Sequence, residues 1–350
     1  MAFSPAPIEL DQVLNVEWLS AALSQGREPV KVKGFEVVET LGPSALKIRI
    51  KLTFDGAPPA DVTDRICIKG IFDPALTQWL KSGAQRTEAN FYKLIAPRLS
   101  FRVPRALYSG FDPETMGGLT IMEDLIPKGV RFLTALSPYT PDQAHKSLDQ
   151  LARLHGGAWN IDPKADEWVT PKLGAMARSQ PQTPERLTEL LHGERGRRLP
   201  EDIKSGPRIY AALTKMAERA ESLGYCLTHG DSHAGNVWEG PEGVGFVDFQ
   251  TLQRGHWAMD VAYHIGAALD VEDRRRSEKD LLRHYLERLK AHGGGDIAFD
   301  DAWKMYQAAA PYGMFMWGIT LRVDPPIIHQ FVTRLGTAVA DHGSFDLLGV

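Results

Sequence analysis

A change in the spacing of apolar side chains restricts the fold of this chain more than any other feature of its sequence. Residues 47–54 alternate between apolar and charged side chains, which places Ile48, Ile50 and Leu52 on one face of a strand. Further strands are predicted for residues 31–40, 65–71 and 118–125. After residue 140 the apolar side chains recur every three or four positions, as in amphipathic helices. The sequence therefore predicts an α+β fold with a small β-rich lobe, residues 1–124, before a larger helical lobe, residues 125–350.

Helix signals occur on both sides of the predicted lobe boundary. In the first lobe, residues 88–95 form a helical stripe that ends before Pro97. In the second lobe, Thr140 can cap a helix that begins at Pro141, and Gln143 can complete a capping box. Later helices are predicted for residues 208–223 and 273–292.

The distribution of charge argues against a nucleic-acid partner. The net charge is −4 and both signs are scattered along the chain, so no basic binding surface is expected. The densest basic run, Arg274-Arg275-Arg276, lies beside acidic residues and is expected to form a solvated helix face. His155 is expected only to cap the end of the helix that begins at Pro141.

Three features indicate a reduced cytoplasmic protein. The chain has two cysteines, Cys67 and Cys226, whereas a secreted chain of this size usually has more. The first residues contain neither a basic segment nor an apolar one, so no signal peptide is expected. The most apolar stretch, residues 308–321, is too short to span a bilayer and contains proline and glycine.

The residues with the clearest chemical meaning lie between positions 225 and 263. Asp231 follows His229 and Gly230, Asn236 follows five residues later, and an apolar strand then ends at Asp248. Phosphoryl transfer from ATP explains this group, because Asp231 can orient an alcohol and accept its proton. Asn236 and Asp248 supply the oxygen ligands that Mg²⁺ prefers. A loop followed by a tight hairpin can bring the three side chains together.

The pattern His-Gly-Asp-x-x-x-x-Asn, followed by a hydrophobic-Asp motif, resembles the aminoglycoside phosphotransferase-like small-molecule kinases. The segments FVDFQ and Asp260-Val261-Ala262-Tyr263 look most like the ecdysteroid-kinase-like and choline-kinase-like branch. The resemblance covers residues 32–289. It implies a two-lobed, protein-kinase-like fold and an ATP- and Mg²⁺-dependent kinase that phosphorylates a hydroxyl of a small molecule.

The resemblance also implies a role for each residue of the motif. Asp231 matches the catalytic base, and Asn236 and Asp248 match the metal ligands. His229 matches a residue that braces the catalytic loop, and Asp260 matches a buried carboxylate that holds the backbone amides of that loop.

In the first lobe the resemblance implies a nucleotide site. Lys69 stands where these kinases carry their strand lysine, which contacts the α- and β-phosphates, and Glu88 would pair with it. Cys67 shares a strand face with Lys69 and is expected to line the roof of the adenine site. The remaining nucleotide-binding candidates are Met122, Glu123 and Leu125 at the hinge, and Gly42 and Ser44 in the phosphate loop. This phosphate loop departs from that of protein kinases, which has several glycines.

Other functions explain only part of the pattern. His229, Asp231 and His233 alternate and could bind zinc or a two-metal cluster, as in a metal-dependent hydrolase. A nucleotide-binding pseudokinase would usually lack one of the site residues that this chain retains. A protein substrate is not expected, because the interval between Asp248 and Asp260 is too short for an activation segment.

The acceptor is expected to have substantial apolar surface. The C-terminal part of the chain carries the aromatic residues and methionines Trp303, Tyr306, Tyr312, Met314, Phe315, Met316 and Trp317. Core packing accounts for most of them, yet together they also suit a pocket for a flat or long apolar alcohol. A polycationic aminoglycoside would need several carboxylates, and this segment has few. We therefore expect a sterol-like, macrolide-like or hydroxyacyl alcohol, with an aminoglycoside- or choline-type acceptor as the alternative.

Overall fold

The computed structural model describes residues 3–42, 45–73, 83–162, 166–178 and 182–350. The chain forms two compact units. The first consists of Met1–Leu99, Val103–Arg131 and Val247–Thr251, and the second of Ser100–Arg102, Phe132–Phe246 and Leu252–Val350. Asp248 thus belongs to the first unit, although the predicted boundary placed it in the second lobe. Phe249 explains the difference, because its ring stacks on that of Phe91 with the centroids 3.7 Å apart.

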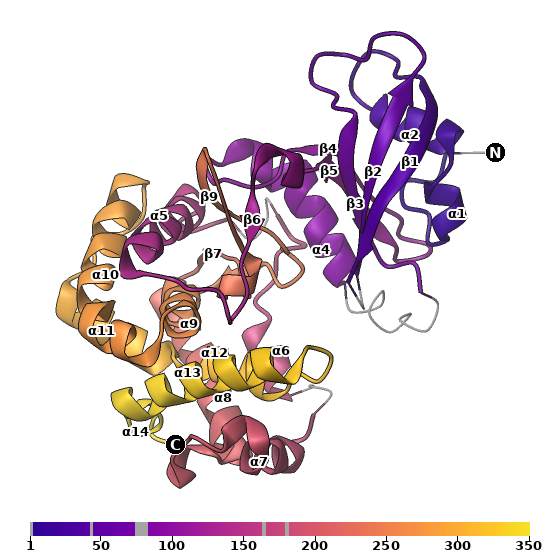
Figure 1. Ribbon diagram of the computed structural model, residues 1–350. Helices are drawn as coiled ribbons and strands as arrows, with labels where there is room; N and C mark the ends of the chain where they lie inside the picture. The colour runs from indigo at the N-terminus through magenta and orange to yellow at the C-terminus, as the bar shows by residue number, and fades with distance from the viewer. Residues whose placement is uncertain (1–2, 43–44, 74–82, 163–165, 179–181) are drawn as a thin grey trace. The chain divides into compact units, whose positions relative to one another are not determined.

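The first unit is built on an antiparallel sheet of five strands in the order β1-β2-β3-β5-β4 (Figure 1). The strands are β1 (Val32–Leu41), β2 (Leu46–Phe54), β3 (Arg65–Gly70), β4 (Ala106–Phe111) and β5 (Gly118–Glu123). The alternating residues Ile48, Ile50 and Leu52 are buried, as the sequence predicts. They pack in one core with the apolar residues of α2 (Val16–Leu23), which follows the short helix α1 (Leu10–Val13).

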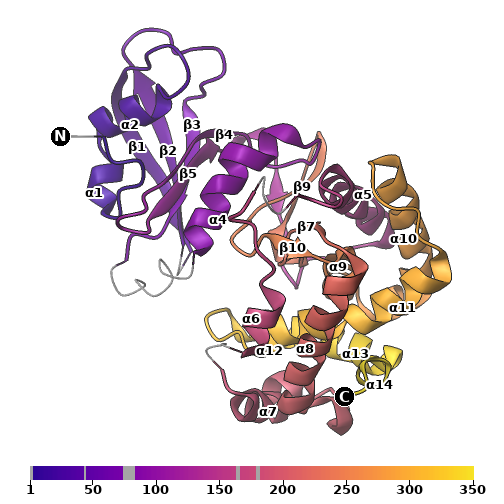
Figure 2. The ribbon, with the colours of Figure 1, turned by 180° about the vertical axis from the view of Figure 1, so that it is seen from behind.

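The helix α4 (Ala84–Asn90) contacts β4 and β5 (Figure 2). It begins earlier than predicted, directly after Gly83, whose φ of 77° lies in the left-handed region that glycine adopts easily. It continues as a π-helical turn, Phe91–Ile95, and a 3₁₀ turn, Ala96–Arg98. Lys69 of β3 extends toward α4, where it pairs with Glu88. The isoleucines of β2 point to the opposite face of the sheet, into the core that contains α2.

The second unit is mainly helical, as predicted. Its first long helix, α5 (Pro141–Gly157), begins with the predicted capping box, in which Thr140 and Gln143 each bind the other's backbone N–H. The later helices are α6 (Leu173–Arg178), α7 (Pro184–His192), α8 (Gly206–Leu223), α9 (Trp257–Ala268), α10 (Val271–Ala291), α11 (Phe299–Ala309), α12 (Pro311–Gly318), α13 (Pro325–His342) and α14 (Ser344–Leu348). The strand β6 (Arg131–Phe132) precedes α5 in the chain and pairs with β8.

A two-stranded sheet and a three-stranded sheet, the latter in the order β6-β8-β9, position the loop with the His-Gly-Asp motif. β7 (Cys226–Thr228) pairs with β10 (Gln253–Gly255), and β8 (Val237–Gly240) pairs with β9 (Gly243–Phe246). The motif residues 229–236 form the loop between β7 and β8 and end in a 3₁₀ turn, Ala234–Asn236. The loop crosses α9, every residue of which is buried. The helices α5, α10, α11, α12 and α13 surround α9 and hold it in the core (Figure 1).

The arginine run on α10 is only partly solvated, which corrects the sequence prediction. Arg274 is buried, lies 2.9 Å from Glu278 Oε2 and also pairs with Asp341 of α13. Arg275 and Arg276 are exposed, as expected. The prediction failed for Arg274 because its acidic partner Asp341 is remote in the sequence.

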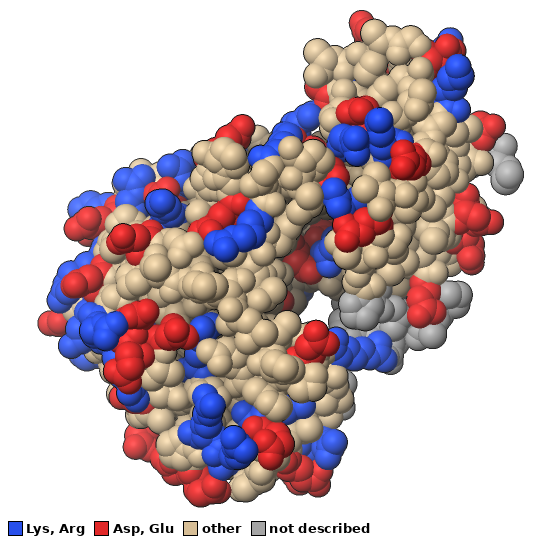
Figure 3. Space-filling model, in the orientation of Figure 1, with Lys and Arg blue, Asp and Glu red and all other residues tan. Residues whose placement is uncertain are grey.

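Charged side chains of both signs are interspersed over the face of the molecule that Figure 3 shows. Among the described residues, none of the helices combines the length and the apolar character needed to cross a bilayer.

Candidate active site

Three charged side chains meet in the first unit. Lys69 Nζ on β3 lies 2.8 Å from Glu88 Oε1 on α4 and 3.1 Å from Asp248 Oδ1. Lys69 and Glu88 are each 5% exposed. The backbone N–H of Phe249 donates to Glu88 Oε1 at 3.2 Å, which ties the segment of Asp248 to α4. The structure therefore brings together the predicted strand lysine, helix glutamate and second metal ligand.

The charges in this cluster keep Lys69 protonated. Burial acts to lower the pKa of Lys69, but the carboxylates of Asp248 and Glu88 outweigh burial and raise that pKa above its ordinary value. Burial raises the pKa of Glu88, and the charge of Lys69 opposes this rise. Lys69 is consequently a fixed positive charge, which is what phosphate oxygens require.

Most other nucleotide-binding candidates lie on the neighbouring strands. Cys67 is two residues before Lys69 on β3, so the two side chains share a face, and Cys67 pairs in register with Met122 of β5. Burial raises the pKa of the Cys67 thiol to about 11. Glu123 ends β5, and Leu125 follows it as a buried residue.

Two backbone positions near the cluster have positive φ angles. Gly42, in the turn between β1 and β2, has φ +95°, and a Cβ there would lie 2.6 Å from the carbonyl oxygen of Ala45. Only glycine fits this turn. Ser44, the other candidate for the phosphate loop, lies outside the described residues. Asp248 has φ 70°, a strained conformation for aspartate of the kind that clusters at functional sites.

The carboxylate of Asp231, in the second unit, is held by three neighbours. The hydroxyl of Tyr263 donates to Oδ1 at 2.9 Å, and Asn236 Nδ2 donates to Oδ2 at 3.3 Å. His233 Nε2 lies 3.4 Å from Oδ2. The Asp231 side chain is nevertheless 25% exposed, so its position is fixed while a substrate can still reach it. This combination suits a general base.

The side-chain amide of Asn236, a predicted metal ligand, is held in place by Asp231. Its Nδ2 also donates to the backbone oxygen of Asp231 at 2.8 Å, which fixes the orientation of the amide. Within the part of the chain that the structure describes, no donor binds its side-chain oxygen. An amide oxygen of this kind is among the hard oxygen ligands that Mg²⁺ prefers.

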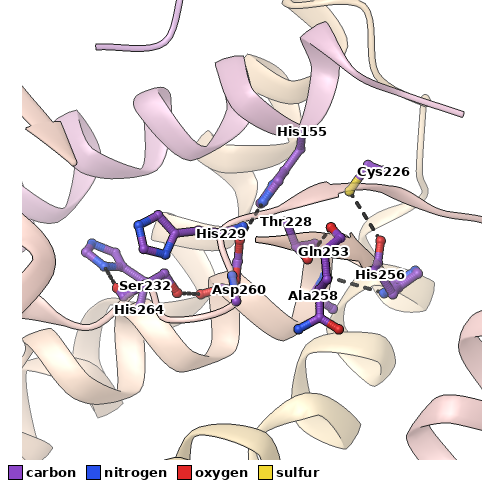
Figure 4. A network of polar contacts seen from close by, with 12 residues as sticks. His155, Cys226, Thr228, His229, Ser232, Gln253, His256, Ala258, Asp260 and His264 are labelled. Atoms are coloured by element: carbon purple, nitrogen blue, oxygen red, sulfur yellow. Dashed lines mark hydrogen bonds and ion pairs between the residues drawn. The ribbon is translucent and has the colours of Figure 1, made fainter. Parts of the chain in front are cut away.

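Asp260 of α9 binds the start of the catalytic loop (Figure 4). One carboxylate oxygen accepts the backbone N–H of His229 at 2.6 Å, and the other accepts that of Gly230 at 2.9 Å. The backbone oxygen of Asp260 accepts the hydroxyl of Ser232 at 2.9 Å. Asp260 is fully buried, so each of these contacts is made away from water, where a hydrogen bond to a carboxylate is strong.

His155 is part of this support, which corrects the prediction that it only caps a helix. Its Nε2 lies 3.1 Å from Asp260 Oδ2, and its Nδ1 lies 2.7 Å from the hydroxyl of Tyr285 on α10. His155 is fully buried and reaches from α5 to the carboxylate (Figure 4). The reason is that α5 packs with α9 and α10, which the sequence of α5 alone does not reveal.

His229 is turned toward its own loop. Its Nδ1 accepts the backbone N–H of Asp231 at 3.2 Å, an arrangement that braces the loop. The described residues contain no group of three or more His, Cys, Asp or Glu side chains arranged to hold a metal ion. The hydrolase alternative, built on His229, Asp231 and His233, is therefore without a ligand cluster in this part of the chain.

Sequence reasoning missed two tyrosines that hold the loop. Tyr263 contacts Asp231, and the hydroxyl of Tyr312 on α12 donates to the backbone oxygen of Gly230 at 2.5 Å. Tyr263 lies three residues after Asp260, on the same helical face, and this spacing could have identified it. No local signal singles out Tyr312, because its partner is 82 residues away in the sequence.

Much of the C-terminal aromatic segment is core. Tyr306, Tyr312, Met314 and Phe315 are at most 1% exposed. Trp317 differs in its position, because its ring lies 5.0 Å from that of His233 and 4.1 Å from that of Phe331 on α13, measured between centroids.

Residues 75–298 match the sequence profile of the phosphotransferase enzyme family, which is more than half of the chain. The chain belongs to this family. The predicted resemblance is thereby confirmed, and the protein is a phosphotransferase. None of the curated proteins matches the chain.

Several solved structures with low sequence identity are similar to this chain. The GDP complex of wild-type aminoglycoside 2′-phosphotransferase-IIIa is 12% identical, with coverage of 93% of this chain and 99% of that chain and a TM-score of 0.50. Plasmodium vivax ethanolamine kinase is 13% identical, with coverages of 88% and 81% and a TM-score of 0.49. The macrolide 2′-phosphotransferase apoenzyme of Brachybacterium faecium is 15% identical, with coverages of 89% and 92% and a TM-score of 0.44. The predicted kinase-like fold, a β-rich lobe before a helical one, is confirmed.

Proposed function

We propose that this phosphotransferase transfers the γ-phosphoryl group of ATP to a hydroxyl of a small molecule, in the presence of Mg²⁺. The observation that carries the proposal is the Asp231 carboxylate, which three neighbours fix while a quarter of the side chain stays exposed. An aspartate with a purely structural role would be fully buried, and an aspartate on the open surface would not be held by a hydroxyl, an amide and an imidazole as Asp231 is.

In this proposal the two units supply different parts of the chemistry. Lys69, kept charged by Glu88 and Asp248, binds phosphate oxygens of the nucleotide. Asn236 and Asp248 would hold Mg²⁺ through their side-chain oxygens. When bound, the metal neutralises charge on the phosphate oxygens during transfer.

Asp231 acts on the acceptor. Its carboxylate orients the hydroxyl and takes the proton as the hydroxyl oxygen bonds to the γ-phosphorus and the bond to ADP breaks. Tyr263 and Asn236 keep the carboxylate in one position, which favours a productive geometry. Asp260 holds the backbone that precedes Asp231, so the base is presented from a rigid loop.

We further propose an acceptor with apolar surface, such as a sterol-like, macrolide-like or hydroxyacyl alcohol. The support for this class is Trp317, whose ring lies 5.0 Å from that of His233 beside the base. An aminoglycoside- or choline-type acceptor is the alternative, and it would need carboxylates or an aromatic cage around its cationic groups.

Coupled ADP release against a broad set of alcohols tests both statements. We expect Mg²⁺-dependent ADP release with one class of alcohol, and loss of that release in Asp231→Asn, while ATP still binds. Near-full activity of Asp231→Asn would overturn the assignment of the base. Efficient turnover of kanamycin with none of any apolar alcohol would overturn the acceptor class alone.

A further inference from the structure

Lys47 faces the same side of the sheet as Lys69. The two residues are direct partners in the antiparallel pairing of β2 with β3. Cross-strand partners point to the same face with Cβ atoms about 5 Å apart, so both ammonium groups extend toward one region. In the sequence, Lys47 is one of the charged residues that alternate with the buried isoleucines.

The head group of Lys47 lies near Gly42, which follows β1. An ideal Cβ placed on Gly42 would be 3.8 Å from Lys47 Nζ. Asp248 and Glu88 are also close enough for their charges to act on Lys47. Lys47 is therefore at the edge of the Lys69 cluster, on the side of the Gly42 turn.

The charge of Lys47 is only partly offset by Asp248 and Glu88. Asp248 and Glu88 both bind Lys69 directly, at 3.1 and 2.8 Å. In the parts of the chain that the structure describes, Lys47 has no hydrogen bond and no ion pair. Burial, followed by the charge of Lys69, lowers the pKa of Lys47, which shows that its surroundings favour the ion poorly. A partly buried ammonium beside a second ammonium gains stability from an added anion.

The Gly42 turn also offers less to a phosphate than a glycine-rich loop does. Several glycines let the backbone approach phosphates closely and bind them through N–H groups. Here one glycine of the described turn, Gly42, has the required backbone freedom, and Pro43 has no N–H to donate. A lysine at the neighbouring strand position supplies positive charge in place of those donors.

We propose that Lys47 is a second phosphate-binding lysine, which contacts the β- and γ-phosphates of the nucleotide beside Lys69. This inference rests on the proposed function, because it requires that the cluster binds a nucleoside polyphosphate. The ligand class is a nucleoside di- or triphosphate, since a chain of phosphates reaches two adjacent lysines and Gly42 more readily than a single phosphate does.

Titration calorimetry with ATP, ADP and AMP, with Mg²⁺ present, tests the inference on Lys47→Met. We expect ATP to bind about 10- to 100-fold more weakly, because a hydrogen bond to a charged group is lost. ADP is expected to weaken similarly, whereas AMP binding should not change. Lys51→Met is the matched control, because Lys51 lies on the same strand and face but is exposed and outside the cluster.

The outcomes separate this inference from the proposed function. If the wild-type protein binds none of the three nucleotides, the proposed function itself is wrong. If the wild type binds ATP and Lys47→Met binds it equally well, or loses AMP and ATP to the same extent, the role of Lys47 is wrong. Lys47→Arg, which keeps the positive charge, is expected to bind ATP more tightly than Lys47→Met. A thermal melting curve like that of the wild type would show that Lys47→Met is folded.

Discussion

Asp260→Asn tests how the loop before the proposed base is held in place. In the protein each carboxylate oxygen of Asp260 accepts one backbone N–H, from His229 at 2.6 Å and from Gly230 at 2.9 Å. Asparagine keeps one acceptor oxygen and presents an NH₂ group in place of the other. The substitution thus removes one charge-assisted hydrogen bond and leaves a buried donor facing another donor.

The size of the effect follows from these two losses. A hydrogen bond to a charged group contributes about 1.5–3 kcal/mol, and a buried donor without an acceptor costs about 1–3 kcal/mol. We therefore expect the free energy of unfolding to fall by about 2.5–6 kcal/mol. Because Asp231 directly follows Gly230, a displaced loop is also expected to lower kcat by about 100-fold. ATP affinity should change little, because Lys69 and Glu88 belong to the first unit.

Urea denaturation measures the change in stability, and ADP release measures kcat under conditions where the variant is folded. Asp280→Asn is the matched control, since this α10 side chain is 75% exposed and its replacement is expected to cost less than about 0.5 kcal/mol. Wild-type stability together with wild-type kcat in Asp260→Asn would refute the role given to this carboxylate.

Three further predictions follow from individual contacts. Tyr263→Phe removes the hydroxyl that donates to Asp231, so kcat should fall about 10-fold in ADP-release assays while ATP affinity is unchanged. A kcat equal to that of the wild type would contradict the positioning role of Tyr263. Mg²⁺-ATP should slow alkylation of Cys67 more than that of Cys226, and alkylation of Cys67 should accelerate as the pH rises toward the thiol pKa of about 11. Identical alkylation of Cys67 with and without bound nucleotide would count against its place in the adenine site. Burial lowers the pKa of His264 to about 4, below the value of about 6.5 in the unfolded chain. Between these two values the unfolded chain binds a proton that the folded chain does not. The free energy of unfolding should therefore decline by about 3 kcal/mol in total as the pH falls from 6.5 to 4. Denaturation midpoints of the wild type and His264→Gln across this range check that prediction, and an equal pH dependence in both would show that another group is responsible.

The sequence predicts the parts of the fold that depend on local pattern. The alternation around Ile48, Ile50 and Leu52 identifies β2 because one face of that strand is buried and the other is polar. The capping box at Thr140 likewise depends on residues only three positions apart. The helix α2 was not predicted, because its eight residues are too few to establish a helical period.

The environment of buried charged residues could not be predicted in the same way. His155 bonds to Tyr285, 130 residues later, and Arg274 pairs with Asp341, 67 residues later. Whether such a residue caps a helix, faces water or enters a buried network is decided by which helices pack together. A local pattern of charges does not contain that information.

The candidate site shows the same division. Spacing alone places Asp231 and Asn236 on one loop, and the structure shows the two side chains in contact. The resemblance supplied the expectation that Lys69 pairs with Glu88, and these side chains are 2.8 Å apart. The sequence does not identify Lys47 as a site residue, because its position beside Lys69 depends on the register of β2 and β3 rather than on a motif.

Transfer of labelled phosphate from [γ-³²P]ATP to a small molecule tests the central claim most directly. Wild-type protein, Asp231→Asn and a reaction without Mg²⁺ would be incubated with a pool of alcohols, and the products separated and identified by mass. We expect the wild type alone, and only with Mg²⁺, to yield a labelled alcohol that has gained one phosphoryl group, together with an equal amount of ADP. Release of inorganic phosphate with no labelled alcohol, or equal labelling by Asp231→Asn, would contradict the proposed function.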